Sequence, residues 1–137
     1  MRAKRFLLRY KEERKKVRRL QAQILELDDL FSVTQDMTSE KVQSSPKPDR
    51  IGEIIARKSD LKEELWEEIA KSMDIMEEIE GVINDVKDAD LQLLLQSRYI
   101  RFMTWEKIAV QFDYSYRWVL ILHGRALMEV EKIIDGV

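Results

Sequence analysis

The sequence predicts an all-α protein, with a long antiparallel helical hairpin of coiled-coil type at residues 1–87 and a helix-turn-helix head at residues 88–137. The first observation is composition: the 137 residues include four glycines and two prolines, and 36% of them are charged. Such a balance is typical of a largely helical chain. The second is a pair of long stretches with apolar residues at helical spacing. The third is a shorter C-terminal pattern that fits two helices joined by a tight turn.

The first long helix is predicted from Ala3 to Phe31. Its apolar stripe has a heptad-like spacing that is interrupted only at Glu13. The stripe consists of Ala3, Phe6, Tyr10, Val17, Leu20, Ile24, Leu27 and Phe31. Residues 32–49 then lose the periodicity and collect Ser, Thr and Gln around a Pro46-Lys47-Pro48 break. We therefore expect a flexible connection at about 32–49.

The second long helix is predicted from near Asp49 or Ile51 to Val86. Its stripe follows i, i+3, i+4 spacing through Ile51, Ile54, Ile55, Leu61, Leu65, Ile69, Met73, Met76, Ile79, Ile83 and Val86. Helices of this length do not stand alone in water, so we expect the two to pair as an antiparallel hairpin. The pairing would also cover Phe102 and Met103.

Charge is segregated between these two helices, although the whole chain carries a net charge of only −2. Residues 1–19 hold ten basic and two acidic side chains, whereas residues 60–90 hold twelve acidic and three basic ones. Antiparallel pairing would place the basic start beside the acidic end. The basic segment has three interpretations: a solvated face balanced by those acids, a sequence-independent phosphate contact, or a surface for a partner protein.

The head begins with Asp88-Ala89-Asp90, a stretch that can cap the next helix. That helix would pack with Leu91, Leu94, Leu95 and Tyr99 on its inner face. In the following stretch, Thr104 to Arg125, two inner pairs fall one turn apart and Ala109 allows a close crossing. The inner pairs are Ile108 with Phe112 and Val119 with Leu122.

The turn of this stretch is predicted at Asp113-Tyr114. A positive backbone angle is usual at such a point, and Asp is among the few residues other than glycine that tolerate it. Ser115 follows as the expected N-cap of the second helix.

Several functions are not expected from this composition. The chain has no cysteine, one histidine, no Gly-rich phosphate loop and no nucleophile–base combination, so we predict no enzyme, no metal and no cofactor. His123 has three interpretations: a hydrogen-bonded structural residue, a phosphate contact or a metal ligand. No apolar run reaches the roughly 20 residues that cross a bilayer, and no signal peptide is apparent, so we expect a cytoplasmic protein without membrane contact.

The C-terminal third resembles the fourth conserved region of bacterial sigma factors, which binds the promoter −35 element. It is more similar still to phage and prophage regulators related to the ArpU and RinA late transcriptional activators. The residues that carry the resemblance are Arg98-Tyr99, Thr104-Trp105-Glu106, Ile108-Ala109, Tyr114-Ser115, Val119 and Leu122-His123-Gly124-Arg125-Ala126-Leu127. The resemblance implies a DNA-binding transcription regulator.

In that interpretation the helix that starts at Ser115 enters the major groove, because a recognition helix presents its first residues to base edges. The candidate DNA contacts are Thr104, Ser115, Tyr116, Arg117, Trp118 and Arg125. Arg117 is the candidate for reading a guanine, and Arg98 and Arg101 are weaker phosphate candidates. A homodimer would match a two-fold operator.

A second hypothesis comes from Leu120 and Ile121, which stand where sigma-like relatives have polar or basic residues. Two apolar groups at that place favour a protein partner. The alternative is therefore a helical interaction module that docks on RNA polymerase or another phage factor without reading DNA.

Overall fold

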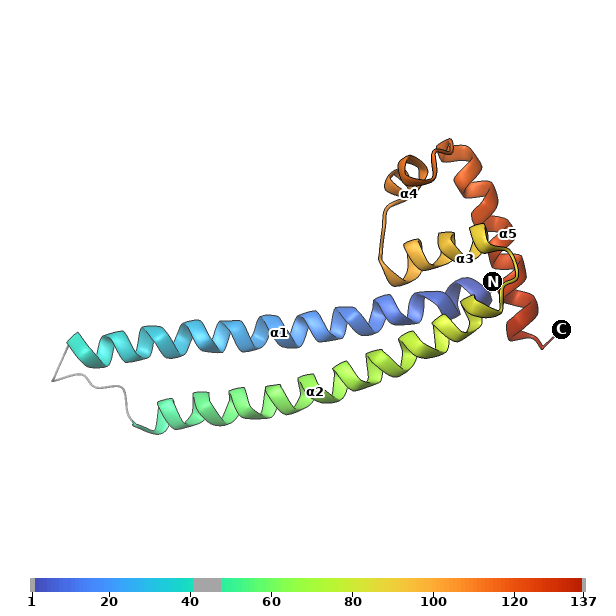
Figure 1. The fold of residues 1–137 in the computed structure, drawn as a ribbon. Helices are drawn as coiled ribbons and strands as arrows, with labels where there is room; N and C mark the ends of the chain where they lie inside the picture. The colour runs from blue at the N-terminus through green and yellow to red at the C-terminus, as the bar shows by residue number, and fades with distance from the viewer. Residues whose placement is uncertain (1, 41–47, 137) are drawn as a thin grey trace. The chain divides into compact units, whose positions relative to one another are not determined.

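The computed structural model describes residues 2–40 and 48–136, and within them it contains helices and no strand (Figure 1). The predicted all-α class is confirmed. The elements are α1 (Arg2–Glu40), α2 (Pro48–Asp85), α3 (Ala89–Leu95), the π-helix η1 (Gln96–Ile100), α4 (Trp105–Phe112) and α5 (Tyr116–Ile134).

The first helix is longer than the sequence suggested. We expected the connection to begin at residue 32, but α1 continues to Glu40 and α2 begins at Pro48. Ser, Thr and Gln lower helix propensity by only a few tenths of a kcal/mol each, and residues 32–40 contain no proline. Pro48 occupies the first helical position, where its missing N–H costs nothing. The rest of the predicted connection, residues 41–47, lies outside the described residues.

The chain divides into two compact units. Unit 1 comprises Met1–Glu13 and Lys71–Val137, and unit 2 comprises Arg14–Ala70. The boundary predicted between residues 87 and 88 falls inside unit 1. The C-terminal helices therefore share a compact unit with the start of α1 and the end of α2.

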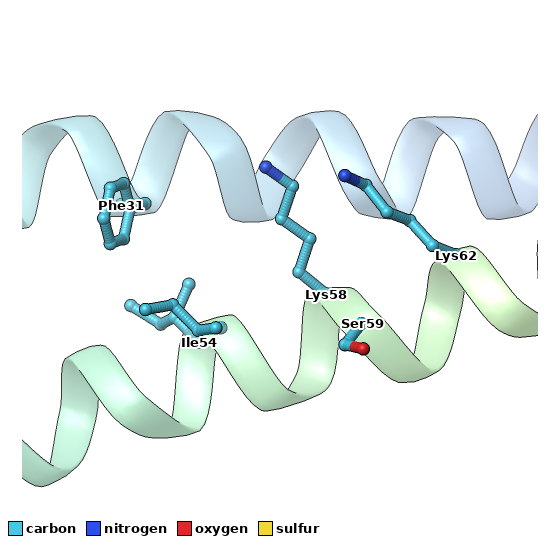
Figure 2. Close-up of a pocket in the computed structure, with 6 residues that line it drawn as sticks. Phe31, Ile54, Lys58, Ser59 and Lys62 are labelled. Atoms are coloured by element: carbon cyan, nitrogen blue, oxygen red, sulfur yellow. The ribbon is translucent and has the colours of Figure 1, made fainter.

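Unit 2 is an antiparallel pair formed by parts of α1 and α2. Leu20 and Ile24 of α1 and Leu61 of α2 form its buried cluster, against which two further leucines pack. An ion pair between Lys58 and Asp28 links the two helices. Beyond the cluster, Figure 2 shows Phe31 of α1 above Ile54 of α2, at a hollow of about 300 Å³ with lysines beside it.

Unit 1 has a larger core, to which every helix contributes. The start of α1 supplies Ala3 and Leu7, α2 supplies Ile75, Ile79 and Ile83, and Val86 follows directly after α2. The remaining buried members are Leu91, Leu94, Leu95, Tyr99, Ile108, Ala109, Val119, Leu122, Ala126, Leu127 and Val130. Each fully buried aliphatic side chain of this kind stabilises the fold by about 1.5–3 kcal/mol.

Polar and aromatic contacts also join the start of α1 to the C-terminal helices. The Ala3 amide donates to Glu131 Oε2 over 2.7 Å, and the Arg2 guanidinium lies 2.8 Å from an Asp135 carboxylate oxygen. Tyr10 stacks on Phe102 with 5.4 Å between ring centroids. Phe102 is thus covered by a helix of the predicted hairpin, as expected.

The predicted proximity of basic and acidic ends is also observed within unit 1. Arg9 of α1 lies 3.1 Å from a carboxylate oxygen of Glu78 in α2. Both side chains are largely exposed, so the ion pair contributes at most about 1 kcal/mol. It accounts for one of the basic side chains without any ligand.

Candidate nucleic-acid interface

The connection between α4 and α5 is a tight turn in which Asp113 is left-handed, with φ 57° and ψ 43°. The Tyr114 amide donates to the Ala109 carbonyl over 3.0 Å, and the Asp113 amide donates to the Val110 carbonyl over 3.2 Å. These two bonds define a Schellman ending of α4. The predicted turn at Asp113-Tyr114 and its positive backbone angle are confirmed.

Both helices of this pair have a hydroxyl N-cap. Thr104 Oγ1 accepts from the Lys107 amide over 3.2 Å, and Ser115 Oγ accepts from the Trp118 amide over 3.1 Å. The predicted Ser115 cap is confirmed, and Asp88 similarly caps α3 through the amides of residues 90 and 91. Each capping hydroxyl accepts one bond and keeps its own hydrogen, so Thr104 and Ser115 can still donate to an anion.

The inner face of α4 and α5 contains the apolar residues that the sequence assigned to it. Ile108, Ala109, Val119 and Leu122 are buried, and Phe112 packs half-buried against them. The same face continues through residues 126, 127 and 130 of α5. This packing fixes which side chains of α5 remain outside.

The outer face of α5 begins with three consecutive exposed residues. Tyr116 is 47% exposed, Arg117 is exposed, and Trp118 is 37% exposed. Within the described residues, Arg117 has no carboxylate or hydrogen-bond partner. One turn further, Leu120 and Ile121 are 39% and 41% exposed, so the apolar pair identified in the sequence also faces outward.

Two of the predicted contact residues are brought together by the helix. The Arg125 guanidinium lies over the Trp118 ring, 5.1 Å from its centroid. An exposed cation–π contact of this kind is worth about 0.5–1 kcal/mol. It holds a cation beside an aromatic surface on the outer face of α5. The other predicted residues lie at the two helix starts, Thr104 before α4 and Ser115 before α5.

His123 belongs to an aromatic cluster on the inner side of α5. Its Nε2 lies 2.6 Å from the Tyr99 hydroxyl, and its ring centroid lies 4.5 Å from that of Trp105. Burial, together with the positive charges of Lys4 and Arg98, lowers the pKa of His123 to about 4. Burial raises the pKa of Tyr99 to about 12, against the opposite effect of Arg98. Both rings are therefore neutral near pH 7, and His123 has a hydrogen-bonded structural position.

Arg98 is a residue whose surroundings the sequence did not reveal. Its guanidinium lies 4.3 Å from the Trp105 ring centroid, and its Nη1 donates to the Met103 carbonyl over 3.0 Å. It is half-buried. The sequence indicated it through the Arg98-Tyr99 pair of the resemblance and as a weaker phosphate candidate, but periodicity does not show which cation packs on which ring.

A metal-binding group and a membrane-spanning helix are both absent from the part of the chain that the structure describes. No group of three His, Cys, Asp or Glu side chains there could hold a metal ion. No helix in residues 2–40 or 48–136 is both long and apolar enough to cross a membrane.

Comparison with known proteins provides no relative. No protein-family model, curated protein or solved structure matches the chain.

Proposed function

We propose that this protein is a phage-type, sigma-like helix-turn-helix regulator of transcription that binds double-stranded DNA. In this proposal α5, which follows the Ser115 cap, enters the major groove. The observation that carries it is Arg117: an exposed, unpaired guanidinium in the first turn of a capped helix, between two exposed aromatic residues. A recognition helix presents its first residues to base edges in this manner.

Each candidate residue has a role that its surroundings permit. Arg117 reads a guanine through two parallel hydrogen bonds, and such a contact is worth about 1–3 kcal/mol of discrimination. Tyr116 and Trp118 contact a thymine methyl or the sugar-phosphate backbone. The Ser115 and Thr104 hydroxyls donate to phosphates from the two helix starts, where the helix dipole also favours an anion. Arg125, beside Trp118, binds a neighbouring phosphate.

The proposal also covers the location and the partners of the protein. A regulator of this kind acts in the cytoplasm, without catalysis and without a cofactor. A homodimer would match a two-fold symmetric operator, and RNA polymerase is a further partner of the proposed regulator.

The test is selection of binding sequences from a random duplex library, followed by anisotropy titrations of selected and random duplexes at two salt concentrations. Arg117→Ala should reduce the preference for the selected duplex by about 5- to 150-fold, the equivalent of roughly 1–3 kcal/mol. Lys132→Ala, which removes the same charge from the far end of α5, should leave the preference unchanged. Absence of binding even at low salt would refute the proposal.

The exposed pair Leu120 and Ile121 favours a second candidate function. Apolar side chains that point outward one turn after Arg117 would pack on a protein partner better than on base edges. In this alternative the same face of α5 docks on RNA polymerase or another phage factor and does not read DNA. Co-purification with polymerase that is lost on Leu120→Asp and unaffected by Arg117→Ala would support it. The opposite pattern would exclude it.

A further inference from the structure

A small hollow in unit 1 lies between the start of α1 and the π-helix η1. It measures about 30 Å³ and is lined by Leu8, Lys11, Arg98, Tyr99 and Phe102. That volume holds about one water-sized atom. Two of its five lining residues carry a positive charge, and no lining residue carries a negative one.

The two cations come from distant parts of the sequence and lack an acidic partner. Neither Lys11 nor Arg98 forms an ion pair with any carboxylate of residues 2–40 and 48–136. By contrast, Arg2 and Arg9 on the same helix pair with Asp135 and Glu78. Like charges that share a hollow repel each other, and an anion placed between them would remove that repulsion.

Arg98 is also pre-oriented for recognition. The Met103 carbonyl and the Trp105 ring fix its guanidinium from two sides, and one Nη is engaged while other N–H groups stay available. A fixed guanidinium loses less side-chain entropy when it binds an anion than a free one does. Planar, two-pronged donation of this kind suits the oxygen atoms of a phosphate.

The position of the hollow links it to the proposed DNA contacts. Met103, whose carbonyl Arg98 holds, immediately precedes Thr104, the N-cap of α4 and a candidate phosphate donor. A phosphate oxygen seated in the hollow would leave the rest of the phosphodiester outside. The backbone of a bound duplex presents such groups in a row.

We infer that Lys11 and Arg98 together bind one backbone phosphate of the DNA, so that the first helix of the chain takes part in DNA binding. This inference rests on the function proposed above. It also divides the basic segment at the start of α1, because Arg2 and Arg9 are used within the protein whereas Lys11 faces the ligand. The contact is independent of base sequence and sensitive to salt.

The first experiment compares Lys11→Ala with Arg5→Ala, which removes the same charge from an exposed position of α1 outside the hollow. Lys11→Ala should weaken binding of selected and random duplexes alike by about 3- to 10-fold. The slope of log affinity against log salt should become less steep by about one. Arg5→Ala should change affinity by less than about twofold, and Lys11→Arg should retain it. Equal losses for Lys11→Ala and Arg5→Ala, or no loss for either, would overturn the inference.

A second experiment identifies the phosphate itself. Single linkages of the selected duplex are replaced by neutral methylphosphonate, and each duplex is titrated with the wild-type protein and with Lys11→Ala. One linkage should weaken wild-type binding by at least the factor seen for Lys11→Ala. The same linkage should cause a smaller loss in that variant, because only Arg98 then still contacts the phosphate. Additive losses at every linkage would contradict the shared contact.

The two proposals fail in different ways. A loss for Lys11→Ala with unchanged selectivity in Arg117→Ala would refute the groove contact and keep the phosphate site. A loss of selectivity in Arg117→Ala with normal affinity in Lys11→Ala would refute the phosphate site alone. Thermal unfolding of each variant checks that the fold is retained.

Discussion

Units 1 and 2 contain parts of the same two long helices, yet they bury very different cores. In unit 2 the buried cluster comprises Leu20, Ile24 and Leu61, and large apolar residues such as Leu25 and Trp66 stay exposed. In unit 1 the same helices meet α3, α4 and α5, and the core includes aliphatic residues from all of them together with Tyr99 of η1. A helix pair can cover one stripe on each helix, whereas a further layer covers more. Stability should therefore be concentrated in unit 1.

Unit 1 also contains the strained backbone positions and the groups with shifted pKa values. The two non-glycine residues with positive φ in the described chain, Phe102 and Asp113, both belong to it. So do Tyr99 and His123, whose pKa values burial shifts to about 12 and about 4. Strained backbone and shifted pKa values gather at functional sites more often than elsewhere. The residues of the proposed DNA interface belong to the same unit.

The largest expected effect comes from shortening one buried leucine in each unit. Leu94 and Leu61 are nearly equally buried, at 0% and 2% exposure, but only Leu94 belongs to the larger core. Leu94→Ala should lower the free energy of unfolding by about 3–4 kcal/mol and Leu61→Ala by about 2 kcal/mol. Urea denaturation measures both values.

Native-state hydrogen exchange provides the control. Leu61→Ala should speed exchange in residues 14–40 and 48–70 while α3, α4 and α5 remain protected. Equal losses of stability in the two variants, with exchange rising everywhere, would contradict the division into a strong and a weak unit.

Acid should weaken unit 1 through His123. The pKa of this residue is about 4 in the folded protein and 6.5 in an unfolded chain, so the unfolded chain binds the proton first. The contribution of the neutral His123 ring to the free energy of unfolding is fully present above pH 6.5 and is lost as the pH falls through 4. After allowance for the solvent that reaches the ring, the loss is about 1–2 kcal/mol. Urea titrations at pH 7 and pH 4.5 measure it.

The matched variant is His123→Gln, which cannot take up the proton. Its stability should fall less than that of the wild type between the two pH values, because only other groups then titrate. If stability changed with pH equally in the wild type and in His123→Gln, protonation of the His123 ring would have no effect on the free energy of unfolding.

At alkaline pH Tyr99 acts in the opposite direction. Its pKa is raised to about 12, so its contribution to stability is lost as the pH rises from 10 through 12.

Local features of the fold were predicted from sequence with good accuracy. Apolar periodicity identified the inner residues of α4 and α5, and simple capping chemistry placed Ser115 and Asp113. These features depend on residues only a few positions apart. Residues 32–40 were missed because weak helix formers still extend a helix that is already nucleated.

Contacts between distant segments were harder to predict. Periodicity assigned residues 1–13 to a hairpin, but it does not show that Ala3 bonds to Glu131 or that Lys11 shares a hollow with Arg98. Those contacts depend on how α1 packs on the C-terminal helices, which a stripe pattern does not specify. For the same reason, the sequence suggested the proposed DNA contacts one by one, but it did not pair Lys11 with Arg98 at the inferred phosphate site.

The smallest expected effect concerns the strain in unit 1. Asp113 has φ 57°, which costs a residue with a Cβ about 1 kcal/mol and costs glycine little. Asp113→Gly should therefore raise the free energy of unfolding by about 0.5 kcal/mol, since the greater freedom of glycine in the unfolded chain offsets part of the gain. Asp113→Ala, which keeps the Cβ and loses the side-chain oxygens that help Asp adopt this conformation, should lower it by a similar amount. Urea denaturation of the two variants at one pH separates backbone strain from the loss of the carboxylate, because both variants remove that charge. If the two variants were equally stable, the turn at Asp113 would carry no strain. The difference in stability between unit 1 and unit 2 would then owe nothing to this turn.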